Sequence, residues 1–143
     1  MKSLIVYDSA FGNTKLVAER IAEVLSSKLV NVKDFKELDL KDIDLILVGS
    51  PINGWRPLPS IVSFLESLKP GKLNGLKATS FDTRVKLFIH GDAKDKIAKS
   101  LKQTGAEIIT EPQAFYVKGS NGPLLESEIE KAKDWANEIK TKL

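Results

Sequence analysis

The amino-acid sequence predicts an α/β fold in which one parallel sheet is covered by helices on both faces. Short, unbroken apolar runs such as Leu4–Tyr7 and Leu45–Gly49 are typical of strands that are buried on both sides. Between such runs, apolar residues recur at helical spacing, as Val17 and Ile21 do. Strands and helices alternate along all 143 residues without an internal repeat, linker or low-complexity segment. We therefore expect a single domain over residues 1–143.

The individual elements follow from the same two patterns. The expected strands are residues 3–8, 29–32, 45–49 and 76–81, with a fifth strand region at 107–109 and 114–117. The expected helices are residues 13–27, 61–68, 94–103 and 124–143. Pro112 interrupts the fifth strand region, Gly105 suits a left-handed cap, and Pro123 is expected in the first turn of the last helix. Ligands of such sheets bind outside the carboxyl ends of the strands, so the loops after strands one, three and four are candidate sites.

Composition excludes several classes of function. The absence of cysteine excludes disulfides, thiolate metal sites and cysteine nucleophiles, and a single histidine argues against a histidine-ligated metal or a Ser-His-Asp triad. The net charge of +3 could suit nucleic acid, but the lysines alternate with acidic residues, which favours solvated helix faces and no nucleic-acid partner. No apolar run is long enough to span a membrane and no signal-peptide pattern is present, so we expect a cytoplasmic protein without a membrane partner.

The loop after the first strand, Ser9-Ala10-Phe11-Gly12-Asn13-Thr14, is the first candidate site. A strand-to-helix turn of small, hydroxylated and amide residues directs free backbone N–H groups and the positive end of a helix dipole at one point. Such a turn can bind phosphate without a charged side chain. The same residues are also good helix caps, so an ordinary cap explains them equally well. The loop lacks the glycine patterns of dinucleotide-binding and ATP-binding turns.

The loop after the third strand, residues 50–57, is the second candidate site. Trp55 lies outside any periodic core pattern and between turn-forming residues, so an exposed indole at the rim of the sheet is expected. A planar aromatic side chain there could stack on a flat ligand. Asn53-Gly54 allows the backbone to adopt positive φ. The alternative is a simple turn whose tryptophan folds back onto the core.

Together, the two loops resemble the flavodoxin family. The pattern Ser9-x-x-Gly12-Asn13-Thr14 is similar to that family's phosphate loop, and residues 49–55 are similar to its first isoalloxazine loop. The resemblance covers essentially the whole chain, and it implies a doubly wound five-stranded parallel sheet in the order 2-1-3-4-5, with FMN as cofactor. In that family, a peptide of the second loop turns over on reduction, and Asn53-Gly54 matches this position. The residues that we expect to bind the cofactor are Ser9, Phe11, Gly12, Asn13, Thr14, Pro51, Asn53, Gly54, Trp55, Asp82, Thr83 and Arg84.

The third candidate loop, Thr79–Arg84, is expected to supply the other edge of the ring and ribityl contacts. A guanidinium from Arg84 at the ring edge would stabilise negative charge on the reduced flavin and raise its reduction potential. The alternative is an exposed arginine that pairs with Asp82 and contributes little. The segment His90-Gly91-Asp92 could form a turn in which Asp92 caps the next helix, or it could supply a catalytic base. We favour the turn.

Three functions remain open from the sequence. The first is an FMN-binding electron carrier that shuttles electrons between redox partner proteins, with the protein setting the flavin's potential. The second is a small FMN-dependent reductase acting on a quinone or NAD(P)H, although the chain offers no long lid or second domain to build a substrate pocket. The third is a flavodoxin-like module that has lost FMN.

Overall fold

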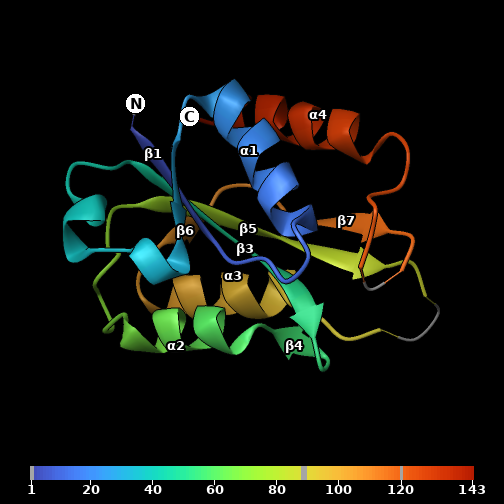
Figure 1. Cartoon of the computed structure of the whole chain (residues 1–143). Helices are drawn as coiled ribbons and strands as arrows, with labels where there is room; N and C mark the ends of the chain where they lie inside the picture. Colours follow the sequence, from blue (N-terminus) through green and yellow to red (C-terminus); the bar gives the residue numbers. More distant parts are fainter. Residues whose placement is uncertain (1, 88–89, 120) are drawn as a thin grey trace.

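The computed structural model describes residues 2–87, 90–119 and 121–143, and it places a central sheet between two layers of helices (Figure 1). Helices α1 (Asn13–Leu25) and α4 (Glu128–Thr141) cover one face, and α2 (Pro59–Ser67) and α3 (Lys94–Gln103) cover the other. The strands are β1 (Ser3–Tyr7), β2 (Lys28–Asn31), β3 (Leu45–Asn53), β4 (Arg56–Pro57), β5 (Lys77–Val85), β6 (Glu107–Ile108) and β7 (Gln113–Val117). No helix among these described residues is long and apolar enough to cross a membrane.

The sheet has the order β2-β1-β3-β5, and β6 and β7 both pair with the outer edge of β5. All of these pairs are parallel. The predicted order 2-1-3-4-5 is therefore confirmed, because β5 is the fourth expected strand and β6 and β7 are the two parts of the fifth. The interruption falls at residues 109–112, as the position of Pro112 predicts.

Successive side chains of a strand point to opposite faces of the sheet, so the core has two halves, one on each face. In β1, Leu4 and Val6 pack with the residues that α2 and α3 bury. Ile5 and Tyr7 pack with those of α1 and α4 instead. Because every side chain of β1 is buried, its residues from Leu4 to Tyr7 form one continuous apolar run rather than an alternating one.

Strand β5 is longer than expected, and this corrects the third candidate loop. The sequence was expected to leave the strand at Phe81, but residues 81–85 pair with β7 on one side and residues 81–83 also pair with β3 on the other. Asp82, Thr83 and Arg84 are therefore buried strand residues rather than loop residues. Because these residues are polar, the hydrophobicity pattern does not predict that the strand continues through them.

The start of the last helix also differs from the expectation. Helix α4 begins at Glu128 instead of residue 124, because residues 123–125 run antiparallel to the end of β7. The backbone N–H of Lys118 donates to the carbonyl of Pro123 (2.9 Å), so this proline belongs to the return segment and not to a first helical turn. The left-handed conformation expected at Gly105 is confirmed, with φ of +106°.

Two short 3-10 turns, Val32–Asp34 and Glu37–Leu40, follow β2 at the edge of the sheet. The carboxylate of Asp39 accepts a hydrogen bond from Lys28 Nζ (2.6 Å) and another from the backbone N–H of Lys36 (2.8 Å). The hydrogen bond from Lys28, followed by that from Lys36, lowers the pKa of Asp39 below its ordinary value. This pair anchors the second turn to the edge strand.

Candidate functional site

A cavity of about 370 Å³ lies beyond the carboxyl ends of β1, β3 and β5. Its volume falls within the roughly 300–1,000 Å³ of typical small-molecule sites. Ten of the twelve expected cofactor-binding residues line it, and the structure thus brings together all three candidate segments. The other two do not line it: Gly12 is exposed in the turn before α1, and Asp82 is buried in β5. The ten lining residues are Ser9, Phe11, Asn13, Thr14, Pro51, Asn53, Gly54, Trp55, Thr83 and Arg84.

The turn between β1 and α1 uses the Ser9 hydroxyl as an internal acceptor. Ser9 Oγ accepts hydrogen bonds from the N–H of Gly12 (2.9 Å) and the N–H of Lys15 (3.4 Å). Gly12 has φ of +92°, a left-handed conformation that bends the chain into the helix. The capping role that the sequence allows for this loop is therefore present, and Ser9 performs it.

The same turn keeps other donors available. In the described part of the chain, four of its backbone N–H groups have no hydrogen-bond partner, and they belong to Ala10, Phe11, Asn13 and Thr14. Two of them are in the first turn of α1, where the helix dipole is positive. Unpaired N–H groups at a helix N-terminus favour an anionic ligand. Capping and anion binding are thus compatible in this loop.

Thr14 connects this turn to the centre of the sheet. Its side chain is almost fully buried, and its Oγ1 lies 2.7 Å from Oγ1 of Thr83 in β5. The hydroxyl of Thr14 therefore already has a protein partner, whereas its backbone N–H has none. This hydrogen bond fixes the start of α1 relative to the cavity wall.

The second loop is a β-hairpin between β3 and the two-residue strand β4, an element that the sequence analysis missed. Asn53 pairs with Arg56, which leaves Gly54 and Trp55 as the two central residues. Both have positive φ, +58° and +75°, as a type I′ turn requires. Positive φ is common for glycine but costs a bulky residue roughly 1–2 kcal/mol. Trp55 therefore adopts a strained backbone conformation.

Contacts from the start of α3 hold this strained residue. The backbone N–H of Asp92 donates to the carbonyl of Trp55 (3.1 Å). Gly91 packs so closely that a Cβ atom there would lie 2.2 Å from the Cα of Trp55, so only glycine fits. The indole itself is 59% exposed and borders the cavity. The expected exposure of Trp55 is confirmed, and the alternative in which it folds back onto the core is wrong.

Two arrangements are expected for Arg84, a guanidinium at the ring edge or an exposed arginine paired with Asp82, and the structure matches neither in full. Arg84 does pair with Asp82, but both side chains are buried. Nε of Arg84 donates to Oδ1 of Asp82 (2.9 Å), and Nη1 lies 3.0 Å from Nδ1 of His90. Burial alone would lower the pKa of Arg84, but the hydrogen bond and charge of Asp82, together with Asp92, outweigh it and raise this pKa. Arg84 thus lines the cavity as half of a neutralised ion pair.

The carboxylates of Asp82 and Asp92, which interact with Arg84, also hold the start of α3. Asp82 accepts a hydrogen bond from the backbone N–H of Lys94 (2.9 Å). Asp92 accepts one from the backbone N–H of Lys96 (3.0 Å), which confirms the expected capping role of Asp92. Arg84, Asp82 and Asp92 thus link β5, the cavity and α3 into one network.

Leu87 and His90 line the cavity although the sequence analysis did not assign them to the cofactor. Leu87 lies two residues beyond β5, so its position depends on that strand continuing to Val85, and Nδ1 of His90 lies 3.0 Å from Nη1 of Arg84 in the same strand. The hydrophobicity pattern ends the strand at Phe81 and therefore gives no signal for them.

Fold and site together define a doubly wound α/β protein with an amide-rich turn and an aromatic hairpin at its switch point. A flavodoxin domain model matches residues 4–120. A flavodoxin of Maridesulfovibrio salexigens is 33% identical over 76% of this chain and 81% of its own. An uncharacterised protein of Methanocaldococcus jannaschii is 31% identical over 97% of this chain and 98% of its own. The structure of oxidised flavodoxin 1 from Bacillus cereus superposes with a TM-score of 0.84, at 22% identity over 100% of this chain and 99% of that one.

The chain belongs to the flavodoxin family. Membership implies a flavin cofactor and a role in electron transfer. The resemblance that the two loops show in the sequence is confirmed.

Proposed function

We propose that this protein binds FMN in the cavity and carries electrons between redox partner proteins. The observation that carries the proposal is the turn of unpaired N–H groups lying beside the exposed indole of Trp55 on one cavity. A phosphate suits the first feature and a flat ring suits the second. The cavity volume of about 370 Å³ is adequate for a small-molecule ligand of this kind.

The phosphate would be held by the turn between β1 and α1. Its ligands would be the free N–H groups of the residues from Ala10 to Thr14, aided by the dipole of α1. Charge-assisted hydrogen bonds to backbone N–H groups contribute roughly 1.5–3 kcal/mol each. Asp8, the nearest carboxylate in the sequence, is buried and accepts hydrogen bonds from Ser60 and from the N–H of Ser9. Its charge is thus already compensated by donors.

The ring would lie between the β3–β4 hairpin and the end of β5. Trp55 would cover one face, and the Asn53-Gly54 peptide would lie beside the ring edge. Thr83 and Arg84 border the cavity from the other side. When bound, FMN supplies the capacity to accept and release one or two electrons. The residues of the chain bind it, orient it and set the charge around it.

Electron carriage is favoured over reductase activity by the open mouth of the cavity. Phe11, Trp55 and Leu87, all in its lining, are each about 60% exposed. A reductase needs a second pocket in which its substrate can lie over the ring, whereas a carrier needs an accessible ring edge. The exposure of these side chains suits a carrier.

The test is to purify the protein and record its visible absorption spectrum, then to titrate the apoprotein with FMN. We expect a yellow protein and FMN binding that Trp55→Ala weakens. Leu38→Ala, which truncates another exposed apolar residue outside the cavity lining, should leave binding unchanged. Failure to bind FMN would support the module without cofactor. Rapid turnover of NAD(P)H or a quinone by the isolated holoprotein would support the reductase.

A further inference from the structure

The mouth of the cavity carries an apolar patch. In the described part of the chain, the large hydrophobic side chains that are exposed are Phe11, Leu38, Trp55, Leu87 and Leu143. Three of these five line the same cavity. They come from three separate segments: the turn after β1, the β3–β4 hairpin and the segment after β5. Exposed apolar side chains that gather in this way mark an interaction surface.

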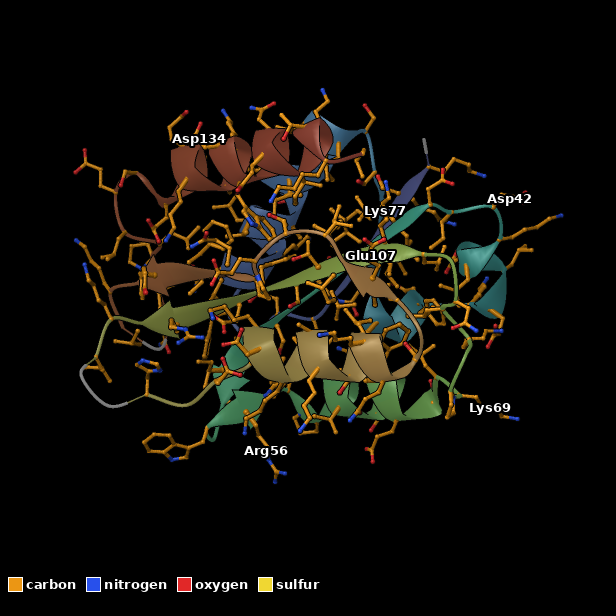
Figure 2. The ribbon with its side chains drawn as sticks, turned by 180° about the vertical axis from the view of Figure 1, so that it is seen from behind. Asp42, Arg56, Lys69, Lys77, Glu107 and Asp134 are labelled. Carbon is orange, nitrogen blue, oxygen red and sulfur yellow. The ribbon has the colours of Figure 1, made fainter. Side chains whose placement is uncertain are left out.

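Exposed cations adjoin this patch along the chain. Lys15, Arg56, Lys86 and Lys118 each directly precede or follow a residue of the cavity lining in the sequence, and all four side chains are exposed. None of the four takes part in an ion pair within the described residues. Figure 2 shows Arg56 extending from β4 away from the ribbon. Lys86 Nζ lies 5.7 Å from the centroid of the Tyr116 ring, so its charge too is not neutralised by a carboxylate in the described residues.

The carboxylates on the same edge are occupied. Asp8 and Asp82 are buried, and each accepts several hydrogen bonds from protein groups. Asp92 is mostly buried, caps α3 and lies 3.4 Å from the guanidinium of Arg84. Asp8 and Asp82 offer no free negative charge to solvent, and the charge of Asp92, whose side chain is 27% exposed, is compensated in part by Arg84.

We infer that the four cations form a positive ring around Phe11, Trp55 and Leu87, and that this surface docks an acidic redox protein over the exposed edge of the cofactor. The inference rests on the proposed function, because it names the partner of the same site. An apolar centre within a charged rim is the usual anatomy of a protein interface. A positive rim attracts a partner with carboxylates around its own redox centre, which accelerates encounter at low ionic strength.

Nucleic acid is the competing occupant, because cations beside aromatic side chains can also bind single strands. Two observations favour a protein. The exposed apolar side chains of Phe11, Trp55 and Leu87 gather at one opening, whereas a strand requires a groove that follows its backbone. Other lysines are paired with acids, such as Lys72 with Glu37 and Lys133 with Glu130, so no basic stripe continues from this ring along those surfaces.

A matched pair of variants isolates the ring. Arg56→Glu with Lys118→Glu reverses two of its charges, and Lys41→Glu with Lys69→Glu reverses two exposed cations elsewhere. Each pair changes the net charge by −4, from +3 to −1. Lys69 lies at the opposite end of α2 from Arg56 (Figure 2). FMN affinity and thermal midpoint are measured first in each, so that loss of cofactor or fold is recognised separately.

A readout without cofactor uses the fluorescence of Trp55. The chain has two tryptophans, and Trp135 is buried, so soluble quenchers act mainly on Trp55. Trp55→Phe supplies the background to be subtracted. We expect iodide to quench Trp55 at least twofold more strongly than caesium at low ionic strength, after correction with neutral acrylamide. The ring variant should abolish this preference and the control variant should keep it; equal quenching by the two ions would overturn the positive ring.

The docking test compares two forms of one acceptor. The fully reduced FMN-loaded protein is mixed with a lysine-rich c-type cytochrome, or with the same cytochrome after its lysines are succinylated. Each haem iron gains one electron, so two cytochromes are reduced per FMN, and the protons of the flavin pass to the buffer. At ~10 mM ionic strength we expect the succinylated form to react at least fivefold faster. The ring variant should lose this preference, and the control should retain it.

The outcomes separate the two levels of the proposal. FMN binding without a preference between the cytochromes overturns the docking inference and leaves the proposed function intact. Absence of FMN binding overturns the proposed function itself. Binding of a fluorescent single-stranded oligonucleotide that the ring variant loses, together with equal cytochrome rates, assigns the surface to nucleic acid instead.

Discussion

Replacing Trp55 by glycine should give a more stable protein than replacing it by alanine. Both changes remove the same exposed indole, so their difference reports on the backbone at φ of +75°. A left-handed conformation costs a residue with a Cβ roughly 1–2 kcal/mol. The extra freedom of glycine in the unfolded chain offsets about 0.4–1 kcal/mol of this. The glycine variant should therefore be more stable by about 0.7 kcal/mol, or about 2–3 °C in Tm for a chain of this length.

The assay is urea and thermal denaturation of the two apoproteins. The same pair of substitutions at Leu38, an exposed residue in a 3-10 turn without positive φ, is the control. There, alanine should be the more stable by about 0.5–1 kcal/mol, because glycine loses more entropy on folding. If glycine at position 55 is as destabilising as it is at position 38, then Trp55 is not strained and the type I′ turn is wrong. In both Trp55 variants, FMN affinity should fall by roughly tenfold, because aromatic pairs contribute about 0.5–1.5 kcal/mol beyond burial.

Three further perturbations test the surroundings of the cavity and the edge of the sheet. Arg84→Met should destabilise the protein by about 3 kcal/mol in urea because it leaves the Asp82 carboxylate buried and unpaired, and adding Asp82→Asn should recover part of the loss. In the holoprotein, Arg84→Met should also lower the reduction potential in a redox titration, and an unchanged potential would contradict a role at the ring edge. Thr83→Val should cost about 1–2 kcal/mol in the same unfolding assay because it orphans the buried Thr14 hydroxyl, whereas the double valine variant should be close to wild type. Because the pKa of Asp39 is lowered in the folded state, its stabilising effect is present above its unfolded pKa of about 3.9 and is lost as the pH falls through the folded value. Asp39→Asn should therefore remove stability at pH 6 and progressively less as the pH falls below about 3.9, and a pH-independent difference would contradict the charge pairing.

The sequence predicts the architecture well where burial alone determines it. Leu4–Tyr7 and Leu45–Gly49 are apolar throughout because parallel strands are buried on both faces, and they are found as β1 and the first part of β3. The interruption near Pro112 follows from the chemistry of that residue, and Gly105 adopts the left-handed conformation expected of it. These elements need no information from distant parts of the chain.

The parts of the fold that were not predicted depend on contacts between residues that are far apart in the sequence. Asp82 and Arg84 look like loop residues, but each neutralises the other inside β5, so a polar segment can continue a central strand. The β3–β4 hairpin was missed because Trp55 occupies a turn position that normally takes glycine. That position is compatible with tryptophan because Gly91 and Asp92 hold its backbone, and they come from a loop some 36 residues later in the chain.

The residues of the candidate site also divide into those that the local sequence predicts and those that depend on distant contacts. The Ser9–Thr14 turn and the exposure of Trp55 follow from local sequence, and the structure gives each the expected place on the cavity. The partner of the Thr14 hydroxyl, Thr83, could not be predicted because it depends on the register of β5. Leu87 and His90 were missed for the same reason.

The most direct test of the proposed cofactor compares the affinities of FMN and riboflavin for the apoprotein by fluorescence titration. The two ligands share the ring and the ribityl chain and differ in the phosphate. If free N–H groups of the Ser9–Thr14 turn hold that phosphate with at least two charge-assisted hydrogen bonds, FMN should bind at least about 100-fold more tightly. Equal affinities would show that the turn is only a helix cap, and binding of neither ligand would contradict a flavin site at this cavity.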